Sequence, residues 1–253
     1  MTDIKNGRPV SAQEPKGEAS PRRLARMAGV LYLIVAIFGG FSFGYATAKV
    51  YMPGDAAATA QLMAADAGLV RMGIVANLFQ ATVWVFLAML LYLLLRHVSE
   101  NAARAMVLLV AIGASITCLN EVFPIAGLLV ASERSYALGF GTVGSQTLVL
   151  LLLDIHHYGF LIAQIFFGLW LVPLGYLAYK SVLFPKVLAA LLVVGGVGYI
   201  VGMLGVYLVP AFGATINTYA TIPSTVAELW MVGYLLVIGI RPSASADRAP
   251  LGV

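Results

Sequence analysis

Charged residues are scarce in this sequence. Asp, Glu, Lys and Arg make up only 10% of its 253 residues, while 61% of the residues are hydrophobic. A typical soluble domain has about 25% charged residues and about 45–50% apolar ones. A water-soluble fold could not hide this much apolar surface, so the composition excludes the soluble classes and indicates an integral membrane protein.

Cysteine is almost absent, and sequence motifs typical of metal and haem sites are missing. Cys118 is the single cysteine, which excludes an intrachain disulfide and a cysteine-rich metal site. No H-E-x-x-H motif occurs, and His97 does not share a depth with His156 and His157, which disfavours a haem held by two histidines. No cofactor is therefore predicted. The basic residues are scattered over short loops, so nucleic acid is not an expected partner.

The hydrophobic residues come in six blocks, each long enough to cross a bilayer as a helix, which takes about 20 residues. Unpaired backbone groups are costly in hydrocarbon, and runs such as Leu87–Leu95 lack the alternation of a β-barrel. The predicted fold is therefore all-α, a polytopic bundle of six transmembrane helices within residues 22–241. The predicted helices cover residues 24–46, 70–95, 105–130, 147–179, 187–209 and 223–240.

The distribution of basic residues predicts the orientation of the chain. Of the 15 Lys and Arg residues, 12 lie in segments on the same side of the membrane as the N-terminus. The other three are Lys49, Arg71 and Arg134. The positive-inside rule then places both termini in the cytoplasm, with a disordered arm over residues 1–21 and a short tail over residues 242–253. A signal-peptidase-like "YATA" leaves cleavage after Ala48 as an alternative, although the apolar run before it is longer than the usual ~7–15 residues.

Three segments are predicted to lie outside the membrane on the other side. In residues 52–69, Asp55 is a suitable N-cap, alanines favour a helix and Gly68 is a suitable end, so a short amphipathic helix is expected on the outer face. Residues 132–146 and 210–224 mix turn residues with aromatics, and they are predicted to be loops.

Glycines mark two predicted packing faces. Gly195, Gly198, Gly202 and Gly205 recur every three or four residues in the fifth block, and a similar spacing occurs in the first block. Such a stripe lets another helix approach closely. Packing within the chain is favoured over a homo-oligomer, because a six-helix bundle has many internal contacts to make.

Polar side chains within the predicted spans are the strongest functional signal. An unpaired charge in hydrocarbon costs about 2.5–3.5 kcal/mol, so these side chains are expected to turn inward and meet in one cluster near the outer surface. A proton, a metal ion or Arg71 at the outer mouth of the second helix would then neutralise the crowded carboxylates. The predicted cluster contains Arg71, Asn77, Asn120, Glu121, Asp154, His156, His157 and Glu228.

A metal ion is one possible occupant of this cluster. At 100° per residue, Asp154 and His157 share one helix face, while His156 points nearly opposite Asp154. Asp154 with His157, completed by Glu121 or Glu228, could supply oxygen and nitrogen ligands, and His156 is a further candidate ligand. A network of ion pairs and hydrogen bonds is favoured over a metal site.

Pro124 lies close to this cluster in the third block. It cannot donate a hydrogen bond to the carbonyl of Asn120, one turn earlier, and this leaves an acceptor beside Glu121. The predicted kink either opens a polar pocket or merely bends the helix.

Several of these segments resemble a bacterial membrane family, that of domain of unknown function 4386. The resemblance runs from about residue 23 to residue 240 through "RLARMAGVLYLIVAIFGG", "GLVRMGIVANL", "LLLDIHHYGFLIAQIFFGLWLVPLGYLAYKS" and "AELWMVGYLLVIG". Its most specific residues are Asp154, His156 and Gly159 in a D-x-H-x-x-G core, Arg71 and Gly73 in an R-x-G motif, and Glu228. His157 departs from the pattern. The resemblance implies a multi-helix protein of the bacterial inner membrane and no particular activity.

Three functions remain open at this point. The favoured one is a non-enzymatic membrane protein whose polar cluster is a structural or ligand-responsive network, with membrane lipids and a partner membrane protein or a second copy as its contacts. A small-solute or proton-coupled transporter is the second, with Asp154, Glu228 and Arg71 as binding or relay groups. The third is a metal-dependent intramembrane enzyme that acts on a lipid-like substrate.

Overall fold

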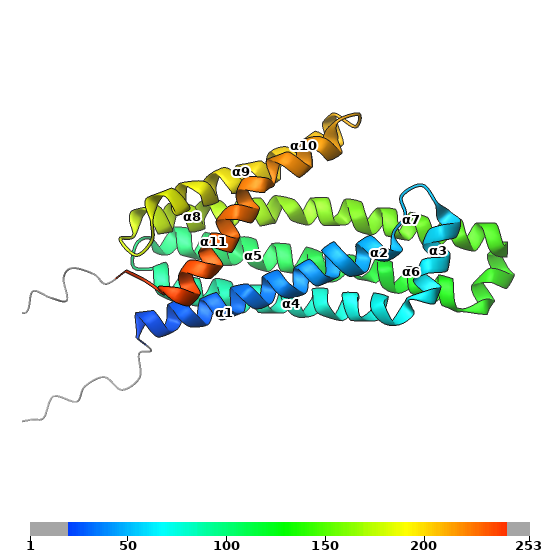
Figure 1. Ribbon diagram of the computed structural model, residues 1–253, viewed down its shortest axis with the longest axis horizontal. Helices are drawn as coiled ribbons and strands as arrows, with labels where there is room; N and C mark the ends of the chain where they lie inside the picture. The colour runs from blue at the N-terminus through cyan, green and yellow to red at the C-terminus, as the bar shows by residue number, and fades with distance from the viewer. Residues whose placement is uncertain (1–19, 242–253) are drawn as a thin grey trace, which may run out of the picture.

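The computed structural model describes residues 20–241, and this part of the chain is helical without strands. Six helical units are long and apolar enough to cross a membrane (Figure 1). They cover Pro21–Val50, Ala67–Leu95, Glu100–Ser132, Arg134–Lys180, Lys186–Leu208 and Gly213–Val237. The predicted all-α, six-span fold is confirmed. The predicted arm and tail lie outside the described residues, apart from Ser20 and Pro21, which begin the first helix.

The first span changes its helical geometry near the end of the bundle that lies away from Pro21, where this span ends. We call this end the outer end, and the opposite end the inner end. It consists of α1 (Pro21–Gly39), a π-helix η1 (Gly40–Thr47) and the short α2 (Ala48–Val50). The Ser20 side chain caps α1 by accepting a hydrogen bond from the amide of Arg23. The sequence predicted a regular helix here. The wider π-turn is rare, occurs often at functional sites, and alters which residues of η1 face the bundle.

A short helix crosses the outer ends of the bundle at the predicted place, but it is apolar along most of its length rather than amphipathic. This helix, α3 (Ala56–Ala65), is capped by Asp55, whose carboxylate accepts a hydrogen bond from the Ala58 amide at 2.9 Å. Its Met63 is fully buried against the bundle, so α3 covers the interior like a lid. The expected end at Gly68 is wrong, because Gly68 already lies within the next helix, α4 (Ala67–Leu95).

Prolines divide the third and fourth spans. The third consists of α5 (Glu100–Asn120) and α6 (Val122–Ser132), and the fourth of α7 (Arg134–Leu169) and α8 (Leu171–Lys180). Each first helix ends four residues before a proline, Pro124 or Pro173, because proline has no N–H for the carbonyl at that position. The break before Pro124 was expected from the sequence.

Two segments predicted as loops are helical instead. Residues 134–146 are the outer end of α7, interrupted only at Gly141 with φ of 73°. Residues 213–224 form α10 (Gly213–Ala220) and the start of α11 (Ile222–Val237), so the last span begins at Gly213 rather than Pro223. Local turn preference is weak, and tertiary packing overrides it here.

The glycine stripe is used within the chain. It lies on α9 (Lys186–Leu208), and an added Cβ at Gly195 or Gly198 would collide with the backbone of Ser224 or Ala220. This helix therefore packs directly on α10 and α11. By contrast, nothing lies within 4 Å of a Cβ placed at Gly40 or Gly44.

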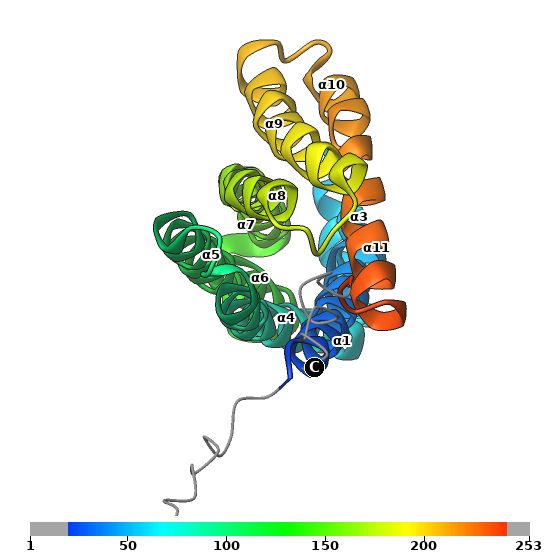
Figure 2. The same cartoon turned by 90° about the vertical axis from the view of Figure 1, so that its left-hand side faces the viewer.

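The inner half of the bundle is a continuous apolar core. The end view shows α7 and α8 lying between α5 and α9 (Figure 2). Large fully buried side chains from α4, α8 and α9 fill this end, among them Leu91, Leu95, Leu177 and Leu188. Buried polar groups are concentrated farther out, where α4, α5, α6 and α7 meet below α3.

Candidate functional site

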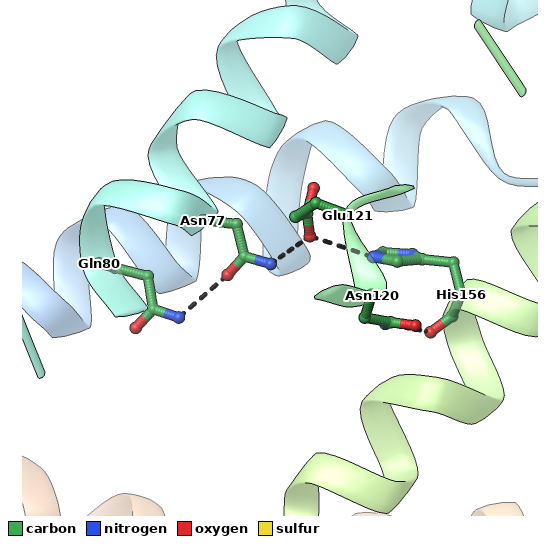
Figure 3. A network of polar contacts seen from close by, with 5 residues as sticks. All are labelled: Asn77, Gln80, Asn120, Glu121 and His156. Carbon is green, nitrogen blue, oxygen red and sulfur yellow. Dashed lines mark hydrogen bonds and ion pairs between the residues drawn. The ribbon is translucent and has the colours of Figure 1, made fainter. Parts of the chain in front are cut away.

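The centre of the site is a contact between an imidazole and a carboxylate. Nε2 of His156 on α7 lies 3.3 Å from Oε1 of Glu121, which occupies the break between α5 and α6 (Figure 3). The exposed fractions are only 4% for His156 and 3% for Glu121. Water is thus nearly excluded from both partners, and electrostatic interactions between them are weakly screened.

Two amides on α4 extend this contact into a chain of hydrogen bonds. The side-chain amide of Asn77 donates to the same Oε1 of Glu121, and the amide of Gln80 donates to Oδ1 of Asn77 at 3.0 Å (Figure 3). Both amide side chains are buried. We call Gln80, Asn77, Glu121 and His156 the outer network. It joins α4, the α5–α6 break and α7.

Local backbone structure explains how the outer network is held. Because α5 cannot continue through Pro124, the chain breaks at Glu121 and Asn120 faces α7. The side-chain amide of Asn120 donates to the carbonyl of His156 at 2.8 Å. A Cβ at Gly159 would collide with Oδ1 of Asn120, so only glycine permits this approach.

A small cavity adjoins the outer network. It has a volume of about 20 Å³, and Ser42, Ala46, Met63, Glu121 and His156 are among its lining residues. A cavity needs about 10–15 Å³ of such space to hold one water molecule. The site can therefore accept a water molecule or a small ion.

Asp154 and His157 lie apart from the outer network, although the sequence placed them in it. Asp154 accepts a hydrogen bond from the hydroxyl of Tyr51 at 2.5 Å, and His157 is exposed near the Tyr51 ring. Residues two apart on a helix point about 200° apart, which separates Asp154 from His156. Burial, and then the hydrogen bond to Asp154, raise the pKa of Tyr51.

Arg71 is also outside the predicted cluster. Its side chain is exposed near the start of α4, and it makes no ion pair within residues 20–241. It does not neutralise Glu121. Gly73 of the same R-x-G motif has a packing role instead, because an added Cβ there would lie 2.8 Å from Cβ of Ala46.

Glu228 belongs to a second polar site. Its two carboxylate oxygens accept hydrogen bonds from the hydroxyls of Tyr32, at 2.8 Å, and Tyr199, at 3.2 Å. Tyr32 lies about 15 Å farther in along the first span than Ser42, which lines the outer cavity, given ten residues at 1.5 Å each. The prediction that Glu228 joins the outer cluster is wrong, because its helix begins earlier and crosses the bundle obliquely (Figure 1).

The predicted metal candidates do not form one ligand set. Of Asp154, His156, His157 and Glu121, only His156 and Glu121 are in contact. Within the described residues, no three His, Cys, Asp or Glu side chains are grouped closely enough to hold a metal ion. Two ligands are fewer than a structural or catalytic zinc site uses.

The sequence of the chain matches the profile of a family described as "Domain of unknown function (DUF4386)" over residues 27–239. The chain belongs to this family. The resemblance drawn from the sequence is thereby confirmed. No curated protein and no solved structure matches it.

The D-x-H-x-x-G core of this DUF4386 protein now has a structural explanation. Asp154 binds Tyr51, His156 contacts Glu121, and Gly159 leaves room for Asn120. The sequence did not identify Tyr51, Tyr32 or Tyr199 as partners of the buried acids. Tyrosines in apolar helices have no signal that separates a hydrogen-bond donor from a packing residue.

Proposed function

We propose that this DUF4386 protein is an inner-membrane protein with cytoplasmic termini, in which the outer network is a non-catalytic, ligand-responsive structural element. The orientation is supported by the excess of Lys and Arg at one end of the bundle, where α1, α5 and α9 begin. Its ligand is a proton, a water molecule or a small ion, by the size of the cavity beside Glu121.

The observation that carries this proposal is the dual contact at one oxygen of Glu121. Oε1 receives the Asn77 amide from α4 and faces the His156 ring from α7. A change of charge on Glu121 or His156 therefore acts on three helical segments at once. Because the contact is buried, such a change is costly unless the helices or a bound ligand respond.

The small volume of the cavity beside Glu121 and His156 argues against a catalytic site there. Intramembrane hydrolysis needs a nucleophile or an activated water together with space for the reacting bond of the substrate. About 20 Å³ beside Glu121 and His156 provides the water position alone.

One observation favours a proton-coupled transporter as a second candidate. Gln80, the inner end of the outer network, also lines a larger cavity that contains Glu228. Polar groups thus continue from the outer cavity to the cavity that contains Glu228. The apolar core around Leu91 and Leu177 closes the inner half, so transport would require these helices to separate.

Hydrogen–deuterium exchange on the protein in lipid nanodiscs tests the leading proposal. Glu121→Gln keeps the shape of the side chain and removes its charge, so we expect it to lower the protection of residues 74–82, 118–130 and 150–160, the three segments that meet at Glu121. Glu133→Gln makes the same change at an exposed acid and should leave this protection unchanged. Wild-type protection in Glu121→Gln would contradict the proposal. Proton flux in liposomes that Glu121→Gln abolishes would favour the transporter.

A further inference from the structure

A second, larger cavity lies in the middle of the bundle. Its volume is about 160 Å³, and its walls come from α1, η1, α4, α7, α9 and α11. Aromatic rings form much of the lining, including those of Tyr32, Trp84, Phe167, Trp170 and Tyr199. Glu228 is the one ionisable acid on this wall, and none of the lining residues is Lys, Arg or His.

The surroundings of Glu228 hold a carboxylate in place without neutralising it. The hydroxyls of Tyr32 and Tyr199 each donate to one of its two oxygens. Neutral phenols orient these oxygens, but they bring no positive charge to a group at mid-membrane depth. A charged group in this position is costly unless a proton or another cation accompanies it.

The rings around Glu228 are arranged in a mutually tilted group. The Trp84 and Trp170 ring centroids lie 5.6 Å apart with planes at 82°, and the Tyr32 centroid lies 5.7 Å from that of Trp170. Aromatic faces carry partial negative charge, and they attract organic cations most strongly where water is excluded. A carboxylate combined with several such rings is the chemistry that recognises an ammonium group.

We propose that this cavity binds a small organic ammonium ion, with the positive nitrogen beside Glu228 and the apolar substituents against the tryptophan and phenylalanine rings. This site uses other residues than the outer network and goes beyond the function proposed above. A metal ion fits less well, because hard cations require several oxygen ligands and one carboxylate is present. A purely apolar ligand would leave a proton as the sole means of neutralising Glu228.

The volume of the cavity limits the size of the ligand. A cavity of about 150 Å³ accommodates a benzene-sized molecule. The ligand is thus a small amine or quaternary ammonium ion with one ring or a few short alkyl groups, and it is not a large dye or a two-chain lipid.

Binding of benzylammonium to the full chain in lipid nanodiscs tests this proposal. Trp84 and Trp170 line the cavity and report on binding by fluorescence, while Trp230→Phe removes the exposed third tryptophan as background. We expect saturable quenching, with empty nanodiscs as the blank. Ethylbenzene has the same shape without the charge, and it should not compete.

Two variants and one control separate the contributions of charge and rings. Glu228→Gln should weaken binding at least tenfold, and Glu133→Gln, which makes the same change at an exposed site, should leave it unchanged. Phe167→Leu keeps the carboxylate and removes a ring, so it should weaken binding by about two- to thirty-fold. It also provides a test if Glu228→Gln fails to fold.

Three results would overturn the proposal. They are the absence of saturable binding to the wild type, equal competition by ethylbenzene, and wild-type affinity in folded Glu228→Gln. Wild-type affinity in Phe167→Leu would overturn the role of the rings. None of these results bears on the exchange experiment at Glu121, so the two proposals fail independently.

Discussion

His156 and Gly159 lie one turn apart on α7, and both face the same break between α5 and α6. His156 contacts Glu121, while Gly159 leaves the space that the Asn120 side chain occupies. Asn120 in turn binds the carbonyl of His156. One turn of α7 is thus held against two consecutive residues of the neighbouring span, which explains why a histidine and a glycine occur three residues apart.

Gly159→Ala should destabilise the protein. Its new Cβ would collide with the Asn120 amide and push it away from the His156 carbonyl. Overpacking of this kind costs about 1–3 kcal/mol. Thermal unfolding in detergent measures the loss, and Gly233→Ala on α11, with nothing within 4 Å of the added atom, is the matched control. Equal stability of the two variants would show that Asn120 does not approach α7 so closely.

Gly198→Ala should destabilise the folded chain without changing its oligomeric state. The glycine faces the backbone of Ala220 within the same chain, so the added methyl group separates α9 from α10. Gly44→Ala is the control, because no atom lies within 4 Å of its added Cβ. Thermal unfolding and light scattering on the purified protein check both parts. A change from dimer to monomer in Gly198→Ala would instead place the stripe in an interface between copies.

Tyr51 should make stability fall at high pH. Burial and the hydrogen bond to Asp154 raise the pKa of its phenol in the folded state, so the folded chain keeps this proton where the unfolded chain loses it. The contribution of Tyr51 is complete below pH of about 10, the ordinary tyrosine value, and is lost as pH rises further. We expect the unfolding temperature to fall more steeply above pH 10 in the wild type than in Tyr51→Phe. Parallel curves would contradict this assignment.

Much of this architecture could be predicted from the sequence, and the failures have identifiable causes. The lengths of the hydrophobic blocks predicted the six spans. The free-energy cost of burying polar groups suggested that Asn77, Glu121 and His156 meet, and these side chains are in contact. The position of a polar side chain along its span was less predictable. Residues 213–222 were mistaken for a loop because of their turn-forming composition, and this error placed Glu228 too near the outer surface.

Side-chain partners across helices were the hardest feature to predict. Helical periodicity shows which residues share a face, but it does not show which neighbouring helix that face meets. Tyr32 and Tyr199 therefore gave no sign that they bind Glu228. The π-helix η1 was equally hidden, because it changes the angle between successive residues without a distinctive composition.

A double-mutant cycle between Asn77 and Glu121 tests the central claim most directly, since that contact joins α4 to the α5–α6 break. The unfolding free energies of the wild type, Asn77→Ala, Glu121→Ala and the double variant would be measured in the same detergent. Each single variant leaves a buried partner unsatisfied, which costs about 1–3 kcal/mol. We predict a coupling energy of at least about 1 kcal/mol between the two positions. Strictly additive effects would contradict the outer network.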